Sequence, residues 1–505
     1  MPPVHEKLAA SLEILKTLQD KGQRVFRTVE FPRTHRERLL KTGFLREIIK
    51  GWLMSAAPDT RDGDSTPWYA SFWEFCAQYA VYRFQSDWYI SAEQSLHIHG
   101  QNTAIPPQVI LCSPKASGNA LRLPFQTSLY DLKVSAMPAR QEITMLGDLR
   151  VLTPAAALVG VSEAFFQHAP IESEIALGAV KDSSELLQPL LAGGHSVVAG
   201  RLAGALRRAG RDPLADDILT SMRQAGYTVR ETDPFTPGRE VANFSAYSPV
   251  ISRIRALWAE HGETVRSLAP APPAVAPNKS AYLKAVDEIY ESDAYHSLSI
   301  EGYTVTLELI ERVRSGQWNP DTSDSDRKNR DALAARGYWQ AFQRVKAAVE
   351  QILDNRPPGT VVRRAMRSWY AEMFQPSVVA GIMPATALAG YRTIPVYLRG
   401  SRHVPPRWES IPDAINALFD LLESETSPFV RAVLGHWMVG YIHPYPDGNG
   451  RTARFLMNTM LASGGYPWLV IRVEDRSDYL AALEAASVAG DIVPFARFIA
   501  DRIQP

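Results

Sequence analysis

The residues with the clearest chemistry lie in one stretch, residues 443–454, which reads HPYPDGNGRTAR. It holds an imidazole, His443, and an acidic oxygen ligand, Asp447, together with two glycines and two arginines. Apolar residues recur at helical spacing before it, in residues 429–441, and again after it, in residues 455–462. The pattern therefore predicts a tight loop between two helices, with all of these groups gathered in the loop and at the start of the second helix.

The second half of this stretch has the composition of an anion site. Gly448 and Gly450 allow backbone conformations that other residues avoid, and they fall where the second helix begins. The free N–H groups and the positive dipole end of a helix N-terminus bind anions. Arg451 and Arg454 are three residues apart and so lie on one helical face, where both can clamp a phosphate group. We therefore expect a phosphate-binding site.

Other interpretations of the same residues are weaker. Asp-Gly and Asn-Gly are turn formers, and a lone histidine at a helix end is more often structural than catalytic. A hairpin needs alternating strands on both sides, which the helical flanks do not supply. A P-loop needs a Gly-Lys-Ser or Gly-Lys-Thr ending, which residues 443–454 lack.

The stretch resembles the signature of the Fic family, HPFxDGNGRxxR. Tyr445 stands where the family usually has Phe, which keeps an aromatic anchor. The resemblance spans roughly residues 280–503, about half of the chain. The residues that match the signature are His443, Pro444, Asp447, Gly448, Asn449, Gly450, Arg451 and Arg454, and the similarity continues in residues 390–392, 400–406, 465–467, 476–479 and 491–495.

This resemblance implies a nucleotidyltransferase, a protein adenylyltransferase that moves AMP from ATP to a Ser, Thr or Tyr hydroxyl of a target protein. His443, with an ordinary pKa of roughly 6.5, is the general base, and Asp447 is the ligand for Mg²⁺. Self-modification and a homodimer are also implied. The residues expected to bind the nucleotide are Asp447, Gly448, Asn449, Gly450, Arg451, Arg454 and Tyr479.

Two alternatives for the reaction stay open. The same site can catalyse the reverse reaction and remove AMP from a target. It can also transfer another nucleotide, because nothing in the sequence identifies residues that recognise the base. Near the presumed adenine pocket, Leu480 and Ser487 replace residues that are often aromatic and Asn in relatives. A third hypothesis makes the chain a DNA-binding, toxin–antitoxin-like regulator in which the Fic half is a sensor or toxin.

A second motif predicts autoinhibition. Residues 297–302, SLSIEG, match the family's inhibitory pattern [S/T]xxxE[G/N] with Ser297 and Glu301. The apolar spacing of residues 281–295 predicts a helix that ends near Glu301, with Gly302 as its stop. In the family this glutamate reaches the second arginine of the signature, here Arg454. Such a pair would keep Arg454 from clamping the γ-phosphate. The alternative is an ordinary helix end with a solvated glutamate.

A third segment resembles the family's flap. Residues 393–398 are apolar and β-favouring and lie between two glycines, which favours a short hairpin whose exposed edge aligns a target by main-chain hydrogen bonds. The alternative is a small structural hairpin. The residues expected to form this docking site are Thr393, Ile394, Val396, Gly400 and His403.

The first half of the chain is less specific. Residues 8–18 and 36–54 have helical patterns, and residues 24–50 carry eight basic residues against three Glu, which favours either a winged-helix DNA contact face or a solvated helix pair. The order of elements from residue 88 to residue 210 resembles AbiEi-type antitoxins of abortive-infection systems. The eight basic residues are Arg24, Arg27, Arg33, Arg36, Arg38, Lys41, Arg46 and Lys50.

Composition sets the remaining bounds. The chain has 505 residues, 46% apolar and 21% charged, which is typical of ordinary globular domains. It has no run of about 18 uncharged apolar residues and no signal-peptide pattern at its start, and its two cysteines suggest no disulfide framework. We therefore expect a cytoplasmic protein without a membrane span.

We expect a mainly helical Fic domain with a β-hairpin flap, preceded by an α/β region that starts with a winged helix. Pro, Gly and Asp clusters place the breaks. The predicted domains are a winged helix at 1–60, an AbiEi-like α/β domain at 61–235, a connecting helix and Pro-rich linker at 236–280, and the Fic domain at 281–505.

Overall fold

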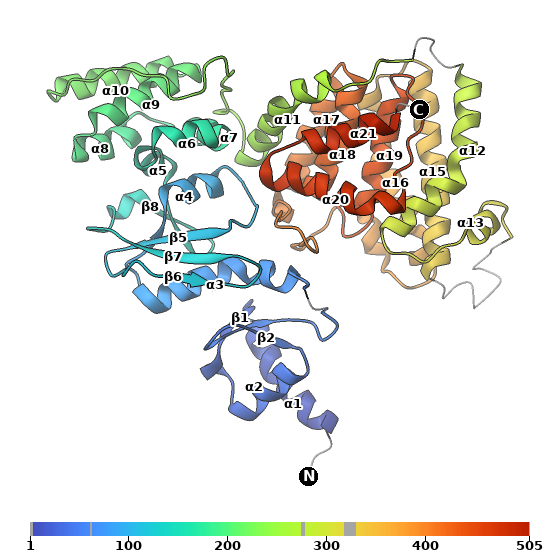
Figure 1. The fold of residues 1–505 in the computed structure, drawn as a ribbon, viewed down its shortest axis with the longest axis horizontal. Helices are drawn as coiled ribbons and strands as arrows, with labels where there is room; N and C mark the ends of the chain where they lie inside the picture. Colours follow the sequence, from blue (N-terminus) through green and yellow to red (C-terminus); the bar gives the residue numbers. More distant parts are fainter. Residues whose placement is uncertain (1–3, 61–62, 274–277, 318–329, 504–505) are drawn as a thin grey trace. The chain divides into compact units, whose positions relative to one another are not determined.

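The computed structural model describes residues 4–60, 63–273, 278–317 and 330–503 (Figure 1). Its contacts divide the chain into two compact units. Unit 1 comprises Met1–Arg253 together with Tyr397–Val404, and unit 2 comprises Ile254–Val396 with Pro405–Pro505. The boundary at residues 253 and 254 falls inside helix α11 (Pro249–Ser267). The expected Pro-rich linker follows this helix, and its residues 274–277 lie outside the described residues. The bounds of the four predicted domains stay predictions.

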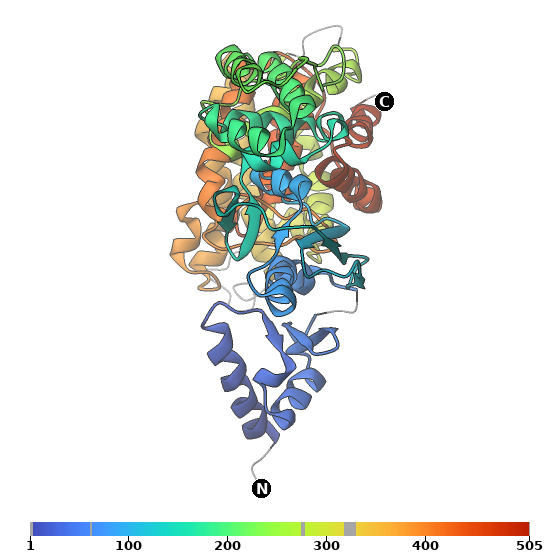
Figure 2. The same cartoon turned by 90° about the vertical axis from the view of Figure 1, so that its left-hand side faces the viewer.

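Unit 1 begins with a small helix-and-sheet module. Its three strands form an antiparallel sheet in the order β1-β3-β2, and its helices pack on a buried cluster that includes Leu15, Leu39 and Leu53 (Figure 2). The winged helix expected at residues 1–60 stays a prediction. The elements are α1 (Val4–Gln19), β1 (Val25–Arg27), the 3₁₀ turn η1 (Thr28–Glu30), α2 (Arg33–Lys41), β2 (Leu45–Ile49) and β3 (Trp52–Ser55).

The helix predicted over residues 36–54 is wrong beyond Lys41. Gly43 and Gly51 both have left-handed backbone angles, with φ of 78° and 91°, and each ends a regular element. Between them Leu45–Ile49 pairs with Trp52–Ser55 as strand β2, and a bulge between Glu47 and Ile49 leaves the buried Leu45 and Ile48 three residues apart, which resembles helical spacing. Residues 36–54 therefore contain the end of helix α2 followed by the strands β2 and β3, and not one continuous helix.

The basic residues of this module are largely used inside it. Arg36 donates to the carbonyl of Thr28 at 2.9 Å, and Arg46 donates to that of Thr60 at 2.6 Å. Arg38 donates to the carbonyl of Lys7 at 2.7 Å. Arg27 lies over the ring of Trp52 in β3. These four guanidinium groups fix the module, which favours the structural interpretation of the basic stretch, and DNA binding stays a prediction.

The rest of unit 1 is an α/β layer followed by small helices. A mixed four-stranded sheet, in the order β4-β5-β7-β6, pairs β5 with β7 in parallel. Helix α3 is aromatic and covers this sheet with a core that includes Trp68, Phe72 and Phe75. Its elements are α3 (Thr66–Phe84), β4 (Tyr89–Ile90), α4 (Ala92–His99), β5 (Gln108–Ser113), β6 (Ala120–Arg122), β7 (Ser128–Lys133), η2 (Arg140–Glu142), β8 (Ile143–Leu146), β9 (Leu149–Leu152), α5 (Pro154–Gly160), α6 (Glu163–His168), α7 (Pro170–Ala179), α8 (Ser184–Gly193), α9 (Ser196–Arg208) and α10 (Asp212–Gln224).

One segment from far along the sequence also belongs to unit 1. Tyr397 and Val404 pack against the aromatic core of the sheet. The backbone N–H of Ile105 donates to the carbonyl of Arg402 at 2.8 Å, and the guanidinium of Arg402 returns two bonds to the carbonyl of Ile105. Residues 397–404 are therefore built into this unit.

Unit 2 is helical. Helices α18 and α19 lie at its centre and are buried on nearly every side; α18 is mostly apolar, whereas α19 also buries polar residues, including its two arginines. The structure confirms a mainly helical domain preceded by a region with small sheets (Figure 1). Besides α11, its elements are α12 (Lys279–Ile300), α13 (Leu307–Arg314), α15 (Arg330–Leu353), α16 (Pro358–Val379), η3 (Ala385–Ala389), η4 (Trp408–Ser410), α17 (Ile411–Ser424), α18 (Pro428–Ile442), α19 (Asn449–Ala462), η5 (Val473–Asp475), α20 (Arg476–Glu484), the π-helical turn η6 (Ala485–Ala489) and α21 (Val493–Ile503).

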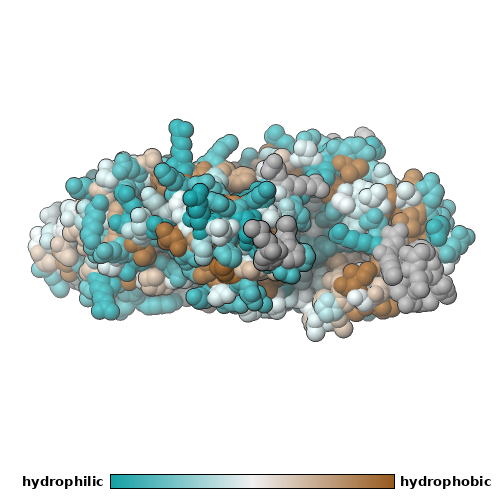
Figure 3. Space-filling view, turned by 90° about the horizontal axis from the view of Figure 1, so that it is seen from below, coloured by the Kyte–Doolittle hydropathy of each residue, from teal (hydrophilic) through white to brown (hydrophobic). Residues whose placement is uncertain are grey.

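The surface mixes polar and apolar residues. On the face drawn in Figure 3, hydrophobic residues are interspersed among hydrophilic ones. Within the described part of the chain, no helix combines the length and the apolar character needed to cross a bilayer.

We expect Gly337→Ala to destabilise unit 2. A Cβ at Gly337 of α15 would overlap the carbonyl of Met373 in α16, and overpacking of this kind costs about 1–3 kcal/mol. The control is Gly262→Ala in α11, where a Cβ meets nothing within 4 Å and the change should stabilise by about 0.5–1 kcal/mol. Urea denaturation followed by tryptophan fluorescence measures both. Equal midpoints for the two variants would contradict the close α15–α16 contact.

Candidate active site

The predicted loop between two helices is present. Helix α18 ends at Ile442, and His443 follows in the left-handed conformation, with φ of 49° and its N–H bonded to the carbonyl of Val439. Gly448 is also left-handed, at φ 76°, and α19 begins directly after it. A left-handed non-glycine residue costs roughly 1–2 kcal/mol, so neighbouring groups must hold His443 in place.

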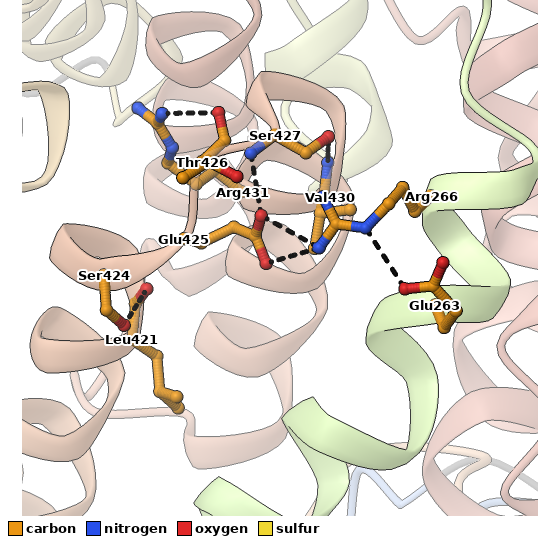
Figure 4. Close-up of polar contacts among 9 residues, drawn as sticks. All are labelled: Glu263, Arg266, Leu421, Ser424, Glu425, Thr426, Ser427, Val430 and Arg431. Atoms are coloured by element: carbon orange, nitrogen blue, oxygen red, sulfur yellow. Dashed lines mark hydrogen bonds and ion pairs between the residues drawn. The ribbon is translucent and has the colours of Figure 1, made fainter.

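The start of α18 is fixed by polar contacts (Figure 4). The hydroxyl of Ser427 caps the helix by accepting the N–H of Val430 at 3.3 Å. Glu425 accepts the N–H of Ser427 at 2.7 Å and pairs with Arg266 of α11 at 3.2 Å, while Arg266 also reaches Glu263. Such a cap stabilises a helix by about 1 kcal/mol. The helix that ends at His443 is thus anchored at its other end.

Asn449 has a different role from the one the sequence predicts. Its side-chain oxygen accepts the N–H of Tyr445 at 2.9 Å, and its side-chain nitrogen donates to the carbonyl of Tyr445 at 2.8 Å. The ring of Tyr445 stacks on Tyr370 with centroids 4.1 Å apart. Both ends of the Asn449 amide are bonded to the loop backbone, so this residue closes the loop, and its expected contact with phosphate stays a prediction.

Two arginines present unsatisfied donors at the start of α19. Arg451 is 1% exposed and lies between the rings of Tyr303 and Phe374, each 5.2 Å from its guanidinium carbon. Among the described residues, Nε and Nη2 of Arg451 and Nη1 of Arg454 have no hydrogen-bond partner. A buried donor without a partner is costly, so these groups fit an anion such as a phosphate.

The expected inhibitory contact is present in the geometry. Glu301 caps α12 and its Oε1 accepts Nη2 of Arg454 at 2.7 Å. Nε of Arg454 donates to the hydroxyl of Ser297 at 2.7 Å, and Nη2 also reaches the Ser297 carbonyl. Gly302 follows at φ 86° and stops the helix. Burial raises the pKa of Glu301, but the charges of Arg454 and Arg451 outweigh it and hold this pKa below its ordinary value.

The carboxylate of Glu301 also lies at the helix start itself. A Cβ added to Gly450 would collide with Oε1 of Glu301, so this oxygen lies directly against the glycine backbone. That place, at the first turn of α19, is where an anion gains most from the free N–H groups and the helix dipole. Glu301 therefore fills part of the cradle in addition to pairing with Arg454.

His443 is suited to act as a base. Burial first, and then the positive charge of Arg392, lower its pKa to about 4, against the opposing effects of a backbone hydrogen bond at Gly440 and of the Glu301 and Asp447 charges. The imidazole is therefore neutral at pH 7 and can accept a proton.

Asp447 is the acidic residue of the loop and is half exposed. Its Oδ1 accepts the N–H of Gly448 at 2.6 Å and lies 3.5 Å from Nη2 of Arg451. In the described residues, no cluster of three or more His, Cys, Asp or Glu side chains could hold a metal ion. A single carboxylate suits Mg²⁺, which takes most of its oxygen ligands from water and phosphate.

The structure adds residues that motif matching missed. The hydroxyl of Tyr479, expected near the nucleotide, is buried and bonds to Nε2 of His436 at 2.9 Å. Burial lowers the pKa of His436 to about 3, so it stays neutral. On α12, buried Asp293 accepts the hydroxyl of Tyr338 at 2.6 Å, one turn before Ser297. The helical spacing of Asp293 and Ser297 was the available signal, but the partners come from distant helices.

The flap differs from the expected hairpin. Residues 393–405 contain a turn at Arg399 and Gly400 but no paired strands. The carbonyls of Ile394 and Pro406 accept hydrogen bonds from the Arg392 side chain instead of the backbone bonds that pair two strands. Thr393 and Ile394 are exposed and Val396 is half-buried, as a docking segment needs.

His403 was expected to contact the target, but its side chain is buried, and residues 397–404 belong to unit 1. Its N–H donates to the hydroxyl of Ser401. Gly400 occupies the turn with φ of 74°. Thr393, Ile394 and Gly400 are exposed, and their role in docking stays a prediction.

This helix–loop–helix, with a neutral histidine before a glycine-flanked turn and two buried arginines after it, defines a phosphate-handling site. Residues 363–461 match the Fic/DOC family. The resemblance inferred from the motif is confirmed, and the chain contains a Fic domain.

Relatives by sequence share the same half of the chain. "Protein adenylyltransferase Fic" of Nematostella vectensis is 33% identical over 221 residues, 43% of this chain and 48% of that protein. The protein of the same name from Drosophila willistoni is 34% identical over 231 residues, 44% of this chain and 42% of that one. The chain thus spans about half the length of these curated relatives. A solved structure of Fic-1 (aa134–508) from C. elegans matches with a TM-score of 0.37 at 20% identity, over 68% of this chain and 96% of that one.

We expect Tyr445→Phe to raise stability by about 1 kcal/mol, because the Tyr445 hydroxyl is buried and has no partner among the described residues. The control is Tyr338→Phe, which removes the bond to buried Asp293 and should cost about 1–3 kcal/mol. Chemical denaturation of the two variants measures the difference. Destabilisation of similar size in both would show that the Tyr445 hydroxyl has a partner.

Proposed function

We propose that this protein is an adenylyltransferase that moves AMP from ATP to a hydroxyl side chain of a target protein, and that Glu301 restrains it. The observation that supports this best is the buried Arg451 guanidinium at the start of α19, next to the loop with the neutral histidine; its Nε and Nη2 have no hydrogen-bond partner among the described residues, and Nη2 is ion-paired with Asp447 at 3.5 Å. The names of the sequence relatives supply the reaction.

The proposed step is a displacement at phosphorus. The target hydroxyl oxygen bonds to the α-phosphorus of ATP, the bond from that phosphorus to the bridging oxygen breaks, and pyrophosphate leaves. His443 takes the hydroxyl proton, which its low pKa allows at neutral pH. Arg451 and the N–H groups at the start of α19 hold phosphate oxygens and stabilise the charge that develops on them.

Magnesium fits the same site. We place it at Asp447, whose half-exposed carboxylate is the acidic ligand of the loop. When bound, Mg²⁺ neutralises negative charge on the phosphates.

Regulation follows from the position of Glu301. While its carboxylate bonds Arg454 and lies against Gly450, a terminal phosphate cannot occupy the same place. Nucleotide that binds then lacks the clamp that would set the phosphate chain in line with the target hydroxyl. Transfer is expected to rise when Glu301 moves away.

The base of the nucleotide is the open part of the proposal. Ser487 accepts the indole N–H of Trp437 at 3.0 Å, and Leu480 is 40% exposed. Neither residue offers a contact that distinguishes adenine from the other bases. The test therefore compares all four nucleotides.

The Glu301→Gly protein, given Mg²⁺, a host lysate and each nucleoside triphosphate labelled at the α-phosphate, should label proteins, including itself, from ATP. Label at the γ-phosphate should not transfer. His443→Ala in this background should lower the rate by about 10²- to 10⁴-fold with nucleotide binding retained, because a general base is lost. The rate should be flat from about pH 6 to 8, because the pKa of His443 lies at about 4.

His168→Ala, at an exposed histidine on α6, is the matched control and should leave labelling unchanged. Efficient labelling from CTP, GTP or UTP instead of ATP would show that the protein transfers a nucleotide other than AMP. Full labelling by the His443→Ala protein would remove His443 from the role of base.

A double-mutant cycle tests the restraint. Glu301→Gly alone should raise the transfer rate over the unchanged protein, and Glu301→Gln, which removes the charge and keeps the bulk, should raise it less. Arg454→Ala should abolish the gain, because the freed clamp is gone. The two residues share one contact, so their effects should be strongly non-additive. Equal rates for Glu301→Gly and the unchanged protein at saturating ATP and Mg²⁺ would place the restraint elsewhere.

A further inference from the structure

Arg392 has an unusual set of partners. It is 2% exposed and lies between η3 and the flap. Its Nε donates to the carbonyl of His443 at 2.8 Å, and its backbone N–H donates to the carbonyl of Pro444 at 2.9 Å. Its Nη1 donates to the carbonyl of Ile394 at 2.9 Å, and Nη2 donates to that of Pro406 at 2.5 Å.

These bonds join three segments that are separate in the sequence. Ile394 and Pro406 lie at the two ends of the flap, and His443 and Pro444 open the catalytic loop. A guanidinium group is planar and carries five donors in a fixed fork, so it can bind several carbonyls at once in one geometry. A lysine at this place has one rotating ammonium group and cannot reproduce that arrangement.

The bond to the His443 carbonyl acts where the backbone is strained. His443 has φ of 49° and ψ of 60°, a conformation that side chains other than Gly and Asn rarely adopt. Orienting its carbonyl toward Arg392 holds this conformation and with it the direction of the imidazole. The same side chain fixes the exposed Ile394, so the base and the docking segment share one support.

We propose that Arg392 is a positioning residue that locks the proposed catalytic base, His443, to the base of the flap, so that a target hydroxyl held by the flap meets the imidazole. This inference rests on the proposed function. Neither nucleotide phosphates nor the target need touch Arg392. Its loss should therefore affect turnover and the apparent affinity for the target, and leave the affinity for nucleotide nearly unchanged.

Arg392 also acts on His443 through its charge. The charged groups that face the imidazole are Arg392, Glu301 and Asp447, of which only Arg392 is positive. Removing that charge raises the pKa of His443, whereas a residue that only supports the fold would leave it in place. In the Glu301→Gly background one opposing carboxylate is already gone, so burial and the Arg392 charge lower the pKa of His443 against Asp447 and the backbone bond at Gly440.

The test compares Arg392→Lys and Arg392→Gln in the Glu301→Gly protein. Both should lower kcat by about 10- to 100-fold, as a misplaced base does, and raise KM for the target, with KM for ATP changed less than about threefold. Arg392→Gln should also move the acid limb of the pH–rate profile to higher pH, and Arg392→Lys, which keeps the charge, should not. The pair thus separates charge from geometry.

The matched control is Arg363→Gln, which removes an arginine of the same unit that bonds Asp420 and Glu423 of α17 away from the loop. It should change neither kcat nor the acid limb. A second measurement needs no activity: diethyl pyrocarbonate acylates neutral imidazole, so the rate of His443 modification against pH, followed by peptide mass spectrometry, reports its titration. Arg392→Gln should shift that curve upward relative to Arg363→Gln.

The outcomes separate the two proposals. If the Glu301→Gly protein transfers no nucleotide, the proposed function is rejected. The dependence of His443 modification on pH would still test the role of Arg392, because it needs no activity. An unchanged curve in Arg392→Gln, or kcat and KM values equal to those of Arg363→Gln, would overturn the positioning role. A lower melting temperature of Arg392→Gln, together with full activity of Arg392→Lys, would likewise show that Arg392 has only a structural role.

Discussion

The bonds between Arg454, Ser297 and Glu301 connect the inhibitory helix to the catalytic helix, and much of unit 2 is arranged around them. A buried guanidinium needs acceptors, because an unpaired buried charge costs several kcal/mol. Arg454 finds them on α12, in the Ser297 hydroxyl and carbonyl and in the Glu301 carboxylate. In the state described here, the same contacts that satisfy Arg454 also place a carboxylate at the anion-binding end of α19.

The proposed restraint lies on a helix whose neighbouring residues have a structural role. One turn before Ser297, Asp293 is buried and bonded to Tyr338 of α15, which fixes the rotation and height of the helix. Burial raises the pKa of Asp293 to about 6. Only Glu301, at the last turn, can move without disturbing these buried contacts. The helix end is therefore a suitable place for a restraint that must be released without unfolding the domain.

Arginine side chains replace regular secondary structure around the flap. Arg392 binds carbonyls at both ends of it, and Arg402 binds the carbonyl of Ile105 within unit 1. Prolines at positions 395, 405 and 406 lack N–H donors and cannot complete a hairpin ladder. Long side chains then supply the bonds that the backbone cannot make, and they fix the flap at chosen points instead of along its length.

The sequence alone determined the loop between two helices, the anion-binding glycines, the two arginines and the end of α12 at Glu301, because each depends on residues close together in the chain. Local patterns misjudged residues 42–54 and the flap, where β-favouring residues were read as a helix or as a hairpin. Only the tertiary structure decided that Asn449 closes the loop, that His403 is buried, and that Arg392 and Asp293 support the site. Those roles depend on carbonyls and rings contributed by distant segments, and no local spacing records which distant groups a fold brings together.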